Sequence, residues 1–291
     1  MYPARPSIPR ELSMTYTAEI SRSNPTCFIF LVDQSASMLG ALDGVLYKSK
    51  ADAVADAINR LLADLVQKCV KEEGVRDYFH VAVIGYGEAV GSALSGPLAD
   101  RNLVALSEIA DNPKRLMQRI EEIPDEAGVL QETPVIFPVW VDPVSAGPTP
   151  MNSALEKAEQ LISSWVDQYP GCFPPIVLNL SDGASTDGDP SDRATSLRSQ
   201  ATSDGAALLF NLHVSRSGGK PVMFPDDETE LPDDYSRLLY SMSSFLPPHI
   251  RSHAESQGHD TSENTRGFVY NADIAAIVEF LEIGTRTTHL L

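Results

Sequence analysis

The sequence is poor in basic residues and has no long apolar run. Lys and Arg number 22 against 40 Asp and Glu in 291 residues, so the formal net charge is −18. A surface this acidic repels nucleic-acid phosphates and anionic lipids, so we expect neither a nucleic-acid nor a membrane function. No segment approaches the roughly 20 apolar residues that span a bilayer. The N-terminal segment, with Met1 or Met14 as its start, has no apolar core of a secretory signal, and we expect a cytoplasmic protein.

Cysteine and nucleophile motifs are scarce as well. Cys27, Cys69 and Cys172 are widely separated and odd in number, which fits neither a disulfide framework nor a metal cluster, so we expect buried free thiols. The chain has no G-x-S-x-G motif, and no histidine follows a candidate serine in the pattern of a catalytic triad. We therefore predict that the protein is not an enzyme.

What the sequence does contain is an alternation of strand and helix patterns. "TCFIFLVD" is a continuous apolar run, typical of a strand buried on both faces, and residues 48–74 carry apolar side chains at helical spacing. Two strands joined by a tight glycine-containing turn follow at 78–98. Further patterns predict helices at 112–123, 151–165, 190–202, 234–246 and from 273, and strands at 174–183, 206–214 and 267–271. Proline in the segment 133–150 argues against continuous strand pairing there.

This order predicts one α/β domain. Strands that alternate with helices form an open, mostly parallel, doubly wound sheet with helices on both faces, here with one antiparallel edge strand from the hairpin. We expect an N-terminal arm at residues 1–24 and the domain at residues 25–288.

Short polar residues follow the predicted strands. Asp33, Ser35 and Ser37 come after the first strand in "FLVDQSASM", Thr149 precedes the helix of Met151, and Asp182 follows the strand "IVLNL". Ligands of open α/β sheets bind beyond the carboxyl ends of the strands, which is where these loops meet. Hydroxyl and carboxylate oxygens suit hard divalent cations such as Mg²⁺ or Mn²⁺. The sequence therefore predicts a metal site at this edge.

The segments "DQSAS", "GPTP" and "LSDG" together resemble the metal-ion-dependent adhesion site of von Willebrand factor type A (vWA) domains, which combines Asp-x-Ser-x-Ser with a later Thr and a later Asp. The resemblance covers residues 24–288 and implies a Rossmann-like sheet that holds magnesium, with manganese or calcium as alternatives. It implies that Ser35, Ser37 and Thr149 ligate the metal, while Asp33 and Asp182 hold ligands or coordinated waters.

The same resemblance implies a binding function. In family members that bind through this site, a Glu or Asp of a protein partner completes the metal's coordination. The chain is similar to standalone, intracellular bacterial vWA proteins, which implies a partner such as an AAA-type ATPase, or a kinase and phosphatase set, in a stress, signalling or defence system. Ala36 stands where the family more often has glycine, and the proline-rich segment before Thr149 is longer than a minimal vWA loop and could border the metal face.

Other interpretations of these residues remain open. Short polar residues also shape turns after strands, and Thr149 could cap the next helix. A metal-assisted hydrolase or phosphoryl-transfer enzyme would need a general base, and spacing assigns no histidine to this face. A scaffold with a degenerate site is the third alternative.

Two further acidic segments receive structural interpretations. Asp187, Asp189 and Asp192 lack EF-hand spacing, so we expect them to cap the next helix and to face solvent. The segment 225–234, "PDDETELPDD", is expected to be a solvated loop, with contact to a basic partner as the alternative.

Overall fold

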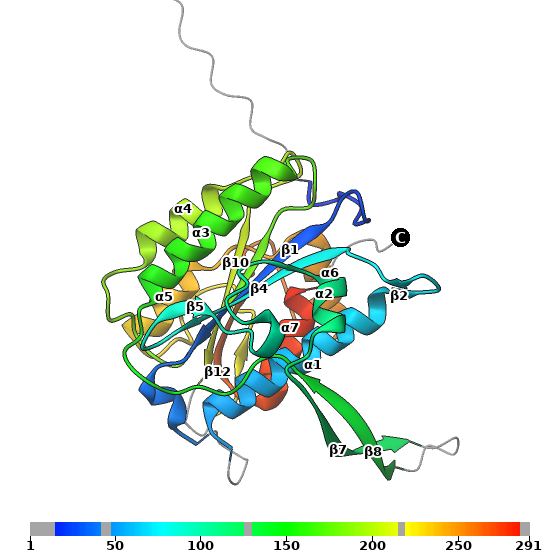
Figure 1. The fold of residues 1–291 in the computed structure, drawn as a ribbon. Helices are drawn as coiled ribbons and strands as arrows, with labels where there is room; N and C mark the ends of the chain where they lie inside the picture. The colour runs from blue at the N-terminus through cyan, green and yellow to red at the C-terminus, as the bar shows by residue number, and fades with distance from the viewer. Residues whose placement is uncertain (1–14, 42–47, 125–129, 215–218, 286–291) are drawn as a thin grey trace, which may run out of the picture.

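The computed structural model describes residues 15–41, 48–124, 130–214 and 219–285. Its centre is a mixed sheet in the order β11-β12-β10-β9-β1-β4-β5, with β6 also paired to β4 (Figure 1). The five strands from β12 to β4 are parallel, and antiparallel strands flank them on both sides. The strands are β1 (Thr26–Asp33), β4 (Phe79–Tyr86), β5 (Val90–Ser92), β6 (Val104–Ala105), β9 (Ile176–Ser181), β10 (Leu208–Val214), β11 (Val222–Met223) and β12 (Phe268–Ala272).

Helices cover both faces of this sheet. One face carries α1 (Lys50–Cys69), α2 (Leu106–Asp111), α6 (Pro248–Ser256) and α7 (Ile274–Gly284). The other carries α3 (Met151–Gln168), α4 (Ser191–Ser199) and α5 (Asp234–Met242). The apolar run of β1 serves both layers, because Phe28 and Phe30 face α1 while Ile29 and Leu31 face α3. The predicted Rossmann-like α/β fold is confirmed, including the hairpin of β4 and β5.

A two-stranded hairpin projects from this body at the lower right of Figure 1. It consists of β7 (Arg115–Pro124) and β8 (Leu130–Val139), paired without interruption along their length. The predicted helix at 112–123 is therefore wrong, and so is the expectation that proline would interrupt pairing. Leu116 and Ile120 are spaced for a helix, but they also share one face of a strand. Pro134 and Pro138 are tolerated because β8 has a neighbour on one side only, so a missing N–H on the other side loses no ladder bond.

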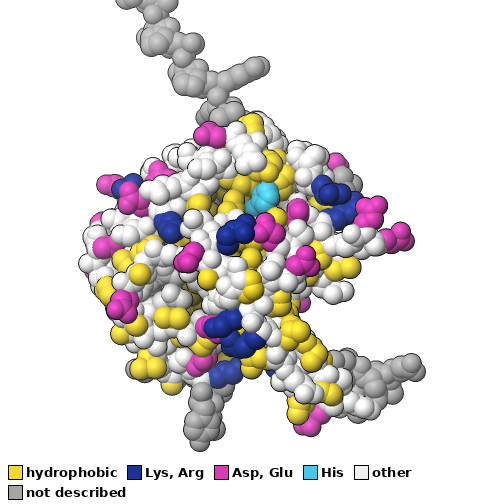
Figure 2. All heavy atoms as spheres, viewed as in Figure 1, with side chains coloured by type: hydrophobic (Ala, Val, Ile, Leu, Met, Phe, Trp, Pro, Cys, Tyr) yellow, Lys and Arg dark blue, Asp and Glu magenta, His cyan; other side chains and the backbone are white. Residues whose placement is uncertain are grey.

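The hairpin is tied to the body through its inner face and is apolar on its outer face. Arg119 forms an ion pair with Asp56 of α1 at 2.5 Å, and its guanidinium lies 3.7 Å from the centre of the Phe137 ring. Figure 2 shows hydrophobic side chains along the projecting arm. The most exposed of those described are Leu116, Ile120, Leu130 and Ile136.

Small elements complete the chain. They are the pair β2 (Val70–Lys71) and β3 (Gly74–Val75), and the 3₁₀ turns η1 (Ala36–Leu39) and η2 (Gly96–Leu98). Of the expected N-terminal arm, the described part lies against the body: Ile20 is fully buried, and the Asp204 carboxylate accepts hydrogen bonds from the backbone of Thr17 and Ala18. Cys27, Cys69 and Cys172 are buried free thiols, as expected. Within the described ranges, no helix is both long and apolar enough to cross a membrane.

A chain of buried polar side chains crosses the sheet. The Tyr86 hydroxyl donates to Asn179 Oδ1 at 2.7 Å, Asn179 Nδ2 donates to Asn211 Oδ1 at 2.9 Å, and Asn211 Nδ2 donates to Ser243 Oγ at 2.9 Å. All four residues are fully buried, so each polar group is satisfied inside the protein. These hydrogen bonds link β4, β9 and β10 to the end of α5 beneath the carboxyl edge of the sheet.

Candidate metal centre

The five residues singled out from the sequence lie on three loops at the carboxyl edge of the sheet. Asp33 is the last residue of β1, and Asp182 directly follows β9, its parallel neighbour. Thr149 lies just before α3. Because the strands end side by side, residues far apart in the sequence meet here.

Hydrogen bonds connect four of these residues into one cluster. Ser37 Oγ lies 2.9 Å from Ser35 Oγ and donates to Asp182 Oδ1 at 2.5 Å. The Asp33 carboxylate accepts from the backbone N–H of Ser35 at 2.9 Å and from the Ser181 hydroxyl at 2.8 Å. Asp33 is fully buried, whereas Ser37 is exposed, so the cluster runs from the interior to the surface.

Thr149 faces the same space without joining the cluster. A Cβ atom placed on Gly183 would lie 3.8 Å from Ser37 Oγ and 3.8 Å from Thr149 Oγ1, so both hydroxyls border the small volume in front of this glycine. Within the described part of the chain, the Thr149 hydroxyl has no hydrogen-bond partner, and the residue at the N-cap of α3 is Pro150. The capping role considered for the Thr149 side chain is therefore not its role here.

Backbone hydrogen bonds and close packing fix the positions of these loops relative to one another. Ala36 N–H donates to the carbonyl of Gly147 at 3.0 Å, and Ala146 N–H donates to the carbonyl of Gln34 at 2.7 Å. Gly147 has a φ of +81°, and a Cβ there would come within 2.5 Å of the backbone nitrogen of Glu88. The loop that carries Thr149 thus lies directly on the loop that carries Ser35 and Ser37, and the long proline-rich segment delivers it there.

A second set of hydrogen bonds attaches the loop after Asp182 to the start of α3. The Asp187 carboxylate accepts from the backbone N–H groups of Asn152 and Ser153 at 3.0 and 2.9 Å. Burial would raise the pKa of Asp187, but hydrogen bonds from Ser153 and Ser185 outweigh it and lower that pKa. Asp187 therefore caps α3, the preceding helix, and not the next helix as expected. Asp189 does accept from Ser191 N at 2.9 Å, at the start of α4.

Behind Asp33 lies a layer of residues that the motif did not indicate. The Tyr235 hydroxyl donates to Ser181 Oγ at 3.0 Å, and Ser181 in turn donates to Asp33. His213, the neighbour of Ser181 across β9 and β10, stacks on Tyr270 with ring centres 5.0 Å apart. No histidine was assigned to this face from spacing, yet His213 lies there. The one available signal was its position at the end of a predicted strand.

Lys50 was also missed. The first residue of α1, it is buried, and its Nζ lies 2.8 Å from Asp182 Oδ2. Nothing in the Asp-x-Ser-x-Ser pattern indicates a lysine at this distance in the sequence, because the contact depends on how α1 packs after the loop.

Electrostatics make the site short of positive charge around Asp33. Burial raises the pKa of the Asp33 carboxyl, hydrogen bonds from Ser35 and Ser181 oppose that shift, and the nearby Asp182 adds to it. Burial also raises the pKa of Tyr235, and it lowers the pKa of His213 to about 4. Tyr86 and Tyr235, the two phenols near Asp33, are therefore neutral and give this carboxylate no positive countercharge.

The donor set fits a hard divalent cation. It offers two carboxylates and three hydroxyls, all oxygen, with Ser37 and Thr149 bordering a common space. Among the described residues, no group of three or more His, Cys, Asp or Glu side chains is arranged to hold a metal ion. A site here consequently depends on the hydroxyls, as magnesium sites with few protein ligands and several waters do. Ala36, the departure from the vWA pattern, is exposed in η1 and has no positive φ, so its methyl group is accommodated.

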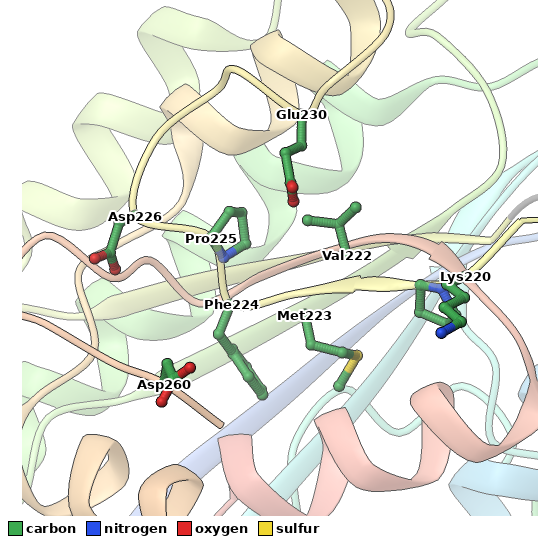
Figure 3. Close-up of a pocket in the computed structure, with 9 residues that line it drawn as sticks. Lys220, Val222, Met223, Phe224, Pro225, Asp226, Glu230 and Asp260 are labelled. Carbon is green, nitrogen blue, oxygen red and sulfur yellow. The ribbon is translucent and has the colours of Figure 1, made fainter. Parts of the chain in front are cut away.

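Other hollows lie away from this cluster. Figure 3 shows one of about 480 Å³ at the β11 edge of the sheet, where Glu230 and Val222 lie on one side of the strand and Phe224 and Asp260 on the other. Asp226 at its rim is engaged by the hydroxyl of Thr265, and Asp233 caps α5 through Ser236 N at 2.7 Å. Two acids of the segment 225–234 thus have structural roles.

Comparisons with known proteins find distant similarities to solved structures. Neither protein-family models nor curated proteins give a match. Among solved structures, proximal thread matrix protein 1 from the mussel byssus is similar at 14% identity and a TM-score of 0.48, over 92% of this chain and 48% of that one. The vWF domain of the pilus tip protein Mfa5 from Porphyromonas gingivalis is similar at 13% identity and a TM-score of 0.31, over 56% of this chain and 39% of that one. The PilB minor pilin from Streptococcus sanguinis is similar at 15% identity and a TM-score of 0.33, over 55% of this chain and 30% of that one. The chain spans less than half the length of each.

Proposed function

We propose that this chain is a vWA-type interaction module that binds a divalent cation, Mg²⁺ first, and through it an acidic side chain of a protein partner. The observation that carries the proposal is the convergence of Ser35, Ser37 and Thr149 with Asp33 and Asp182 on three adjoining loops. When bound, a divalent cation would supply an electrophilic position for a Glu or Asp carboxylate of the partner.

The proposed role of each residue of the site depends on how deeply it is buried. We propose the hydroxyls of Ser37 and Thr149 as ligands. Ser37 donates its proton to Asp182 and accepts from Ser35, which leaves one lone pair for a cation, and Thr149 Oγ1 borders the same space. Asp33, buried and held by Ser181, is placed to orient coordinated water and to supply negative charge. The packed backbones of the loops keep these groups in place before any ligand arrives, which reduces the ordering needed on binding.

Apolar side chains on the same loops suit a protein partner. Leu39, two residues after Ser37, is 70% exposed, and Val144, before Thr149, is 43% exposed. Exposed apolar residues beside a charged centre are typical of interfaces in which a few anchors surround one specific contact. An intracellular partner such as an AAA-type ATPase, or a kinase and phosphatase set, belongs to this proposal.

The binding test uses calorimetric titration of the whole chain with MgCl₂ and MnCl₂. We expect Thr149→Val and Asp33→Asn to weaken cation binding at least about tenfold, since each removes an oxygen or a charge from the site. Thr195→Val, which removes a hydroxyl that bonds only within α4, is the matched control and should bind like the wild type. Unchanged affinity in Thr149→Val and Asp33→Asn would sink the proposal.

The partner is tested by affinity capture from the native cell with Mg²⁺ or with chelator. Proteins retained by the wild type with Mg²⁺ should be lost with chelator and lost with Thr149→Val. Capture that ignores both changes would indicate a scaffold whose site is degenerate.

A hydrolase is not favoured by the surroundings of the site. Among the described residues, His213 is the histidine that we find at this face, and burial lowers its pKa to about 4, so it is a weak base for proton abstraction.

A further inference from the structure

Lys50 occupies a position that is unfavourable for a lysine on two counts. It is the first residue of α1, where the helix dipole disfavours positive charge, and its side chain is only 7% exposed. A long, flexible ammonium side chain would ordinarily reach into solvent, as Lys48 does at 45% exposure. Something must therefore hold Lys50 inside.

That partner is Asp182, one of the five residues of the candidate metal centre. Lys50 Nζ lies 2.8 Å from Asp182 Oδ2, and the Asp182 side chain is fully buried. The other oxygen, Oδ1, accepts the Ser37 hydroxyl. Both oxygens of Asp182 are thus engaged, one by a site hydroxyl and one by a cation that belongs to the chain itself.

The Lys50 ammonium changes the net charge of the cluster. Asp33 and Asp182 bring two negative charges, and Lys50 brings one positive charge, so the cluster has a net charge of −1. A dication would take the same cluster to +1, and a carboxylate of a partner would then return it to neutral. Without Lys50, the dication alone would neutralise the cluster, and the carboxylate would leave it negative.

On the basis of the proposed function, we infer that Lys50 is a built-in competitor of the divalent cation for Asp182, and that it makes cation binding depend on a carboxylate ligand. Lys50 holds Asp182 when the cation is absent, and its charge opposes the cation's arrival. A carboxylate then offsets the excess positive charge, so the chain binds cation and acidic partner together in preference to either alone.

The first test is calorimetric titration of the full chain with MnCl₂, with and without acetate as the carboxylate probe. Lys50→Met should bind Mn²⁺ about tenfold or more tightly than the wild type in the absence of acetate, because a like charge next to the site is gone. Acetate should tighten Mn²⁺ binding in the wild type and have little effect in Lys50→Met. Lys48→Met removes the same charge from the same segment, but Lys48 is solvent-exposed and pairs with Asp56 away from the site, so this variant should behave like the wild type. Lys50→Arg, which keeps the charge, should do so as well.

The outcomes separate this inference from the proposed function. If the wild type binds Mn²⁺ and Lys50→Met binds it equally or more weakly, Lys50 only supports the fold or orients Asp182, and the inference is overturned while the proposed function stands. If no variant binds Mn²⁺, both fall. If Lys50→Met alone binds without acetate, and acetate brings about binding in the wild type, the inference holds in its strongest form; a wild type that does not bind with acetate either would overturn it.

A second measurement needs no variant, in case Lys50→Met does not fold. Brief acetylation of the wild-type chain, analysed by mass spectrometry, should modify Lys50 several times faster with saturating Mn²⁺ than with chelator, because the cation releases its amine from Asp182. Lys48 serves as the internal reference and should be modified at the same rate in both. An unchanged rate at Lys50 in a chain that binds Mn²⁺ would overturn the inference.

Discussion

Replacing Asn59 with alanine should produce one of the larger losses of stability available from a single side chain. Asn59 lies on α1 and is only 3% exposed. Its Nδ2 donates to the carbonyl of Val141 at 2.8 Å, and its Oδ1 accepts from the backbone N–H groups of Trp140 at 2.8 Å and Val141 at 3.0 Å. One amide therefore satisfies three backbone groups where the chain leaves β8 towards Thr149.

The magnitude follows from those three bonds. Each contributes about 1 kcal/mol net, and backbone groups left unpaired in the interior carry a further penalty of about 1–3 kcal/mol, partly relieved if water enters. We expect Asn59→Ala to lower the free energy of unfolding by about 3–4 kcal/mol. Urea unfolding followed by tryptophan fluorescence measures this, since Trp140 is adjacent and buried.

Asn112→Ala is the matched control for that experiment. Asn112 makes one side-chain hydrogen bond, from Nδ2 to the carbonyl of Glu108 at 2.9 Å, at the half-buried end of α2. Its loss should lower the free energy of unfolding by about 1 kcal/mol or less. If Asn59→Ala and Asn112→Ala have the same effect, the three bonds do not support the loop as argued.

Two further predictions concern the loops and the pH response. Gly147→Ala should lower the free energy of unfolding by about 2 kcal/mol and weaken Mn²⁺ binding, because the left-handed φ of Gly147 and the 2.5 Å approach to Glu88 leave no room for a Cβ; calorimetry and urea unfolding that match the wild type would contradict this. The pKa of His213 falls from 6.5 to about 4 on folding, so the folded state binds its proton less readily than the unfolded state, and the associated stability is present above pH 6.5 and lost as the pH falls towards 4. His213→Phe should remove this dependence, worth about 3 kcal/mol at most in urea unfolding from pH 7 to pH 4, and an identical pH profile for both chains would refute it.

The parallel centre of the fold could be predicted because its strands have an unambiguous composition. β1, β9 and β10 are buried on both faces, so β1 is apolar up to Asp33, and β9 and β10 are mainly apolar, with one asparagine each and a polar residue at or near the end. The same feature placed Asp33 and Asp182 at one edge of the sheet. Two residues that follow neighbouring parallel strands must lie close together, whatever the loops do.

The hairpin of β7 and β8 could not be predicted in the same way. Its apolar residues Leu116 and Ile120 are four apart, a spacing that serves one face of a helix and one face of a strand equally well. What selects the strand is pairing with β8 and the contacts of Arg119 with Asp56 and Phe137. Those partners are distant in the sequence, so a local pattern carries no record of them.

The supporting residues of the candidate site were missed for a related reason. Lys50, Tyr235 and His213 reach the loops from α1, α5 and β10, and each arrives through packing that brings separate helices and strands to one edge. The motif describes only the residues of the three loops themselves. It cannot indicate which side chains of other elements will lie behind those loops.

The hydrogen bonds that join Tyr86, Asn179, Asn211 and Ser243 fix the register of the strands in the sheet. If one strand slid by a single residue, its amide would turn to the opposite face and leave its neighbours without a partner in a dry interior. Only one register of β4, β9 and β10 allows all three hydrogen bonds to form. The strand ends that carry the loops at the carboxyl edge are therefore fixed in position. A substitution within one of these loops can change what the loop contacts without changing the register of the sheet.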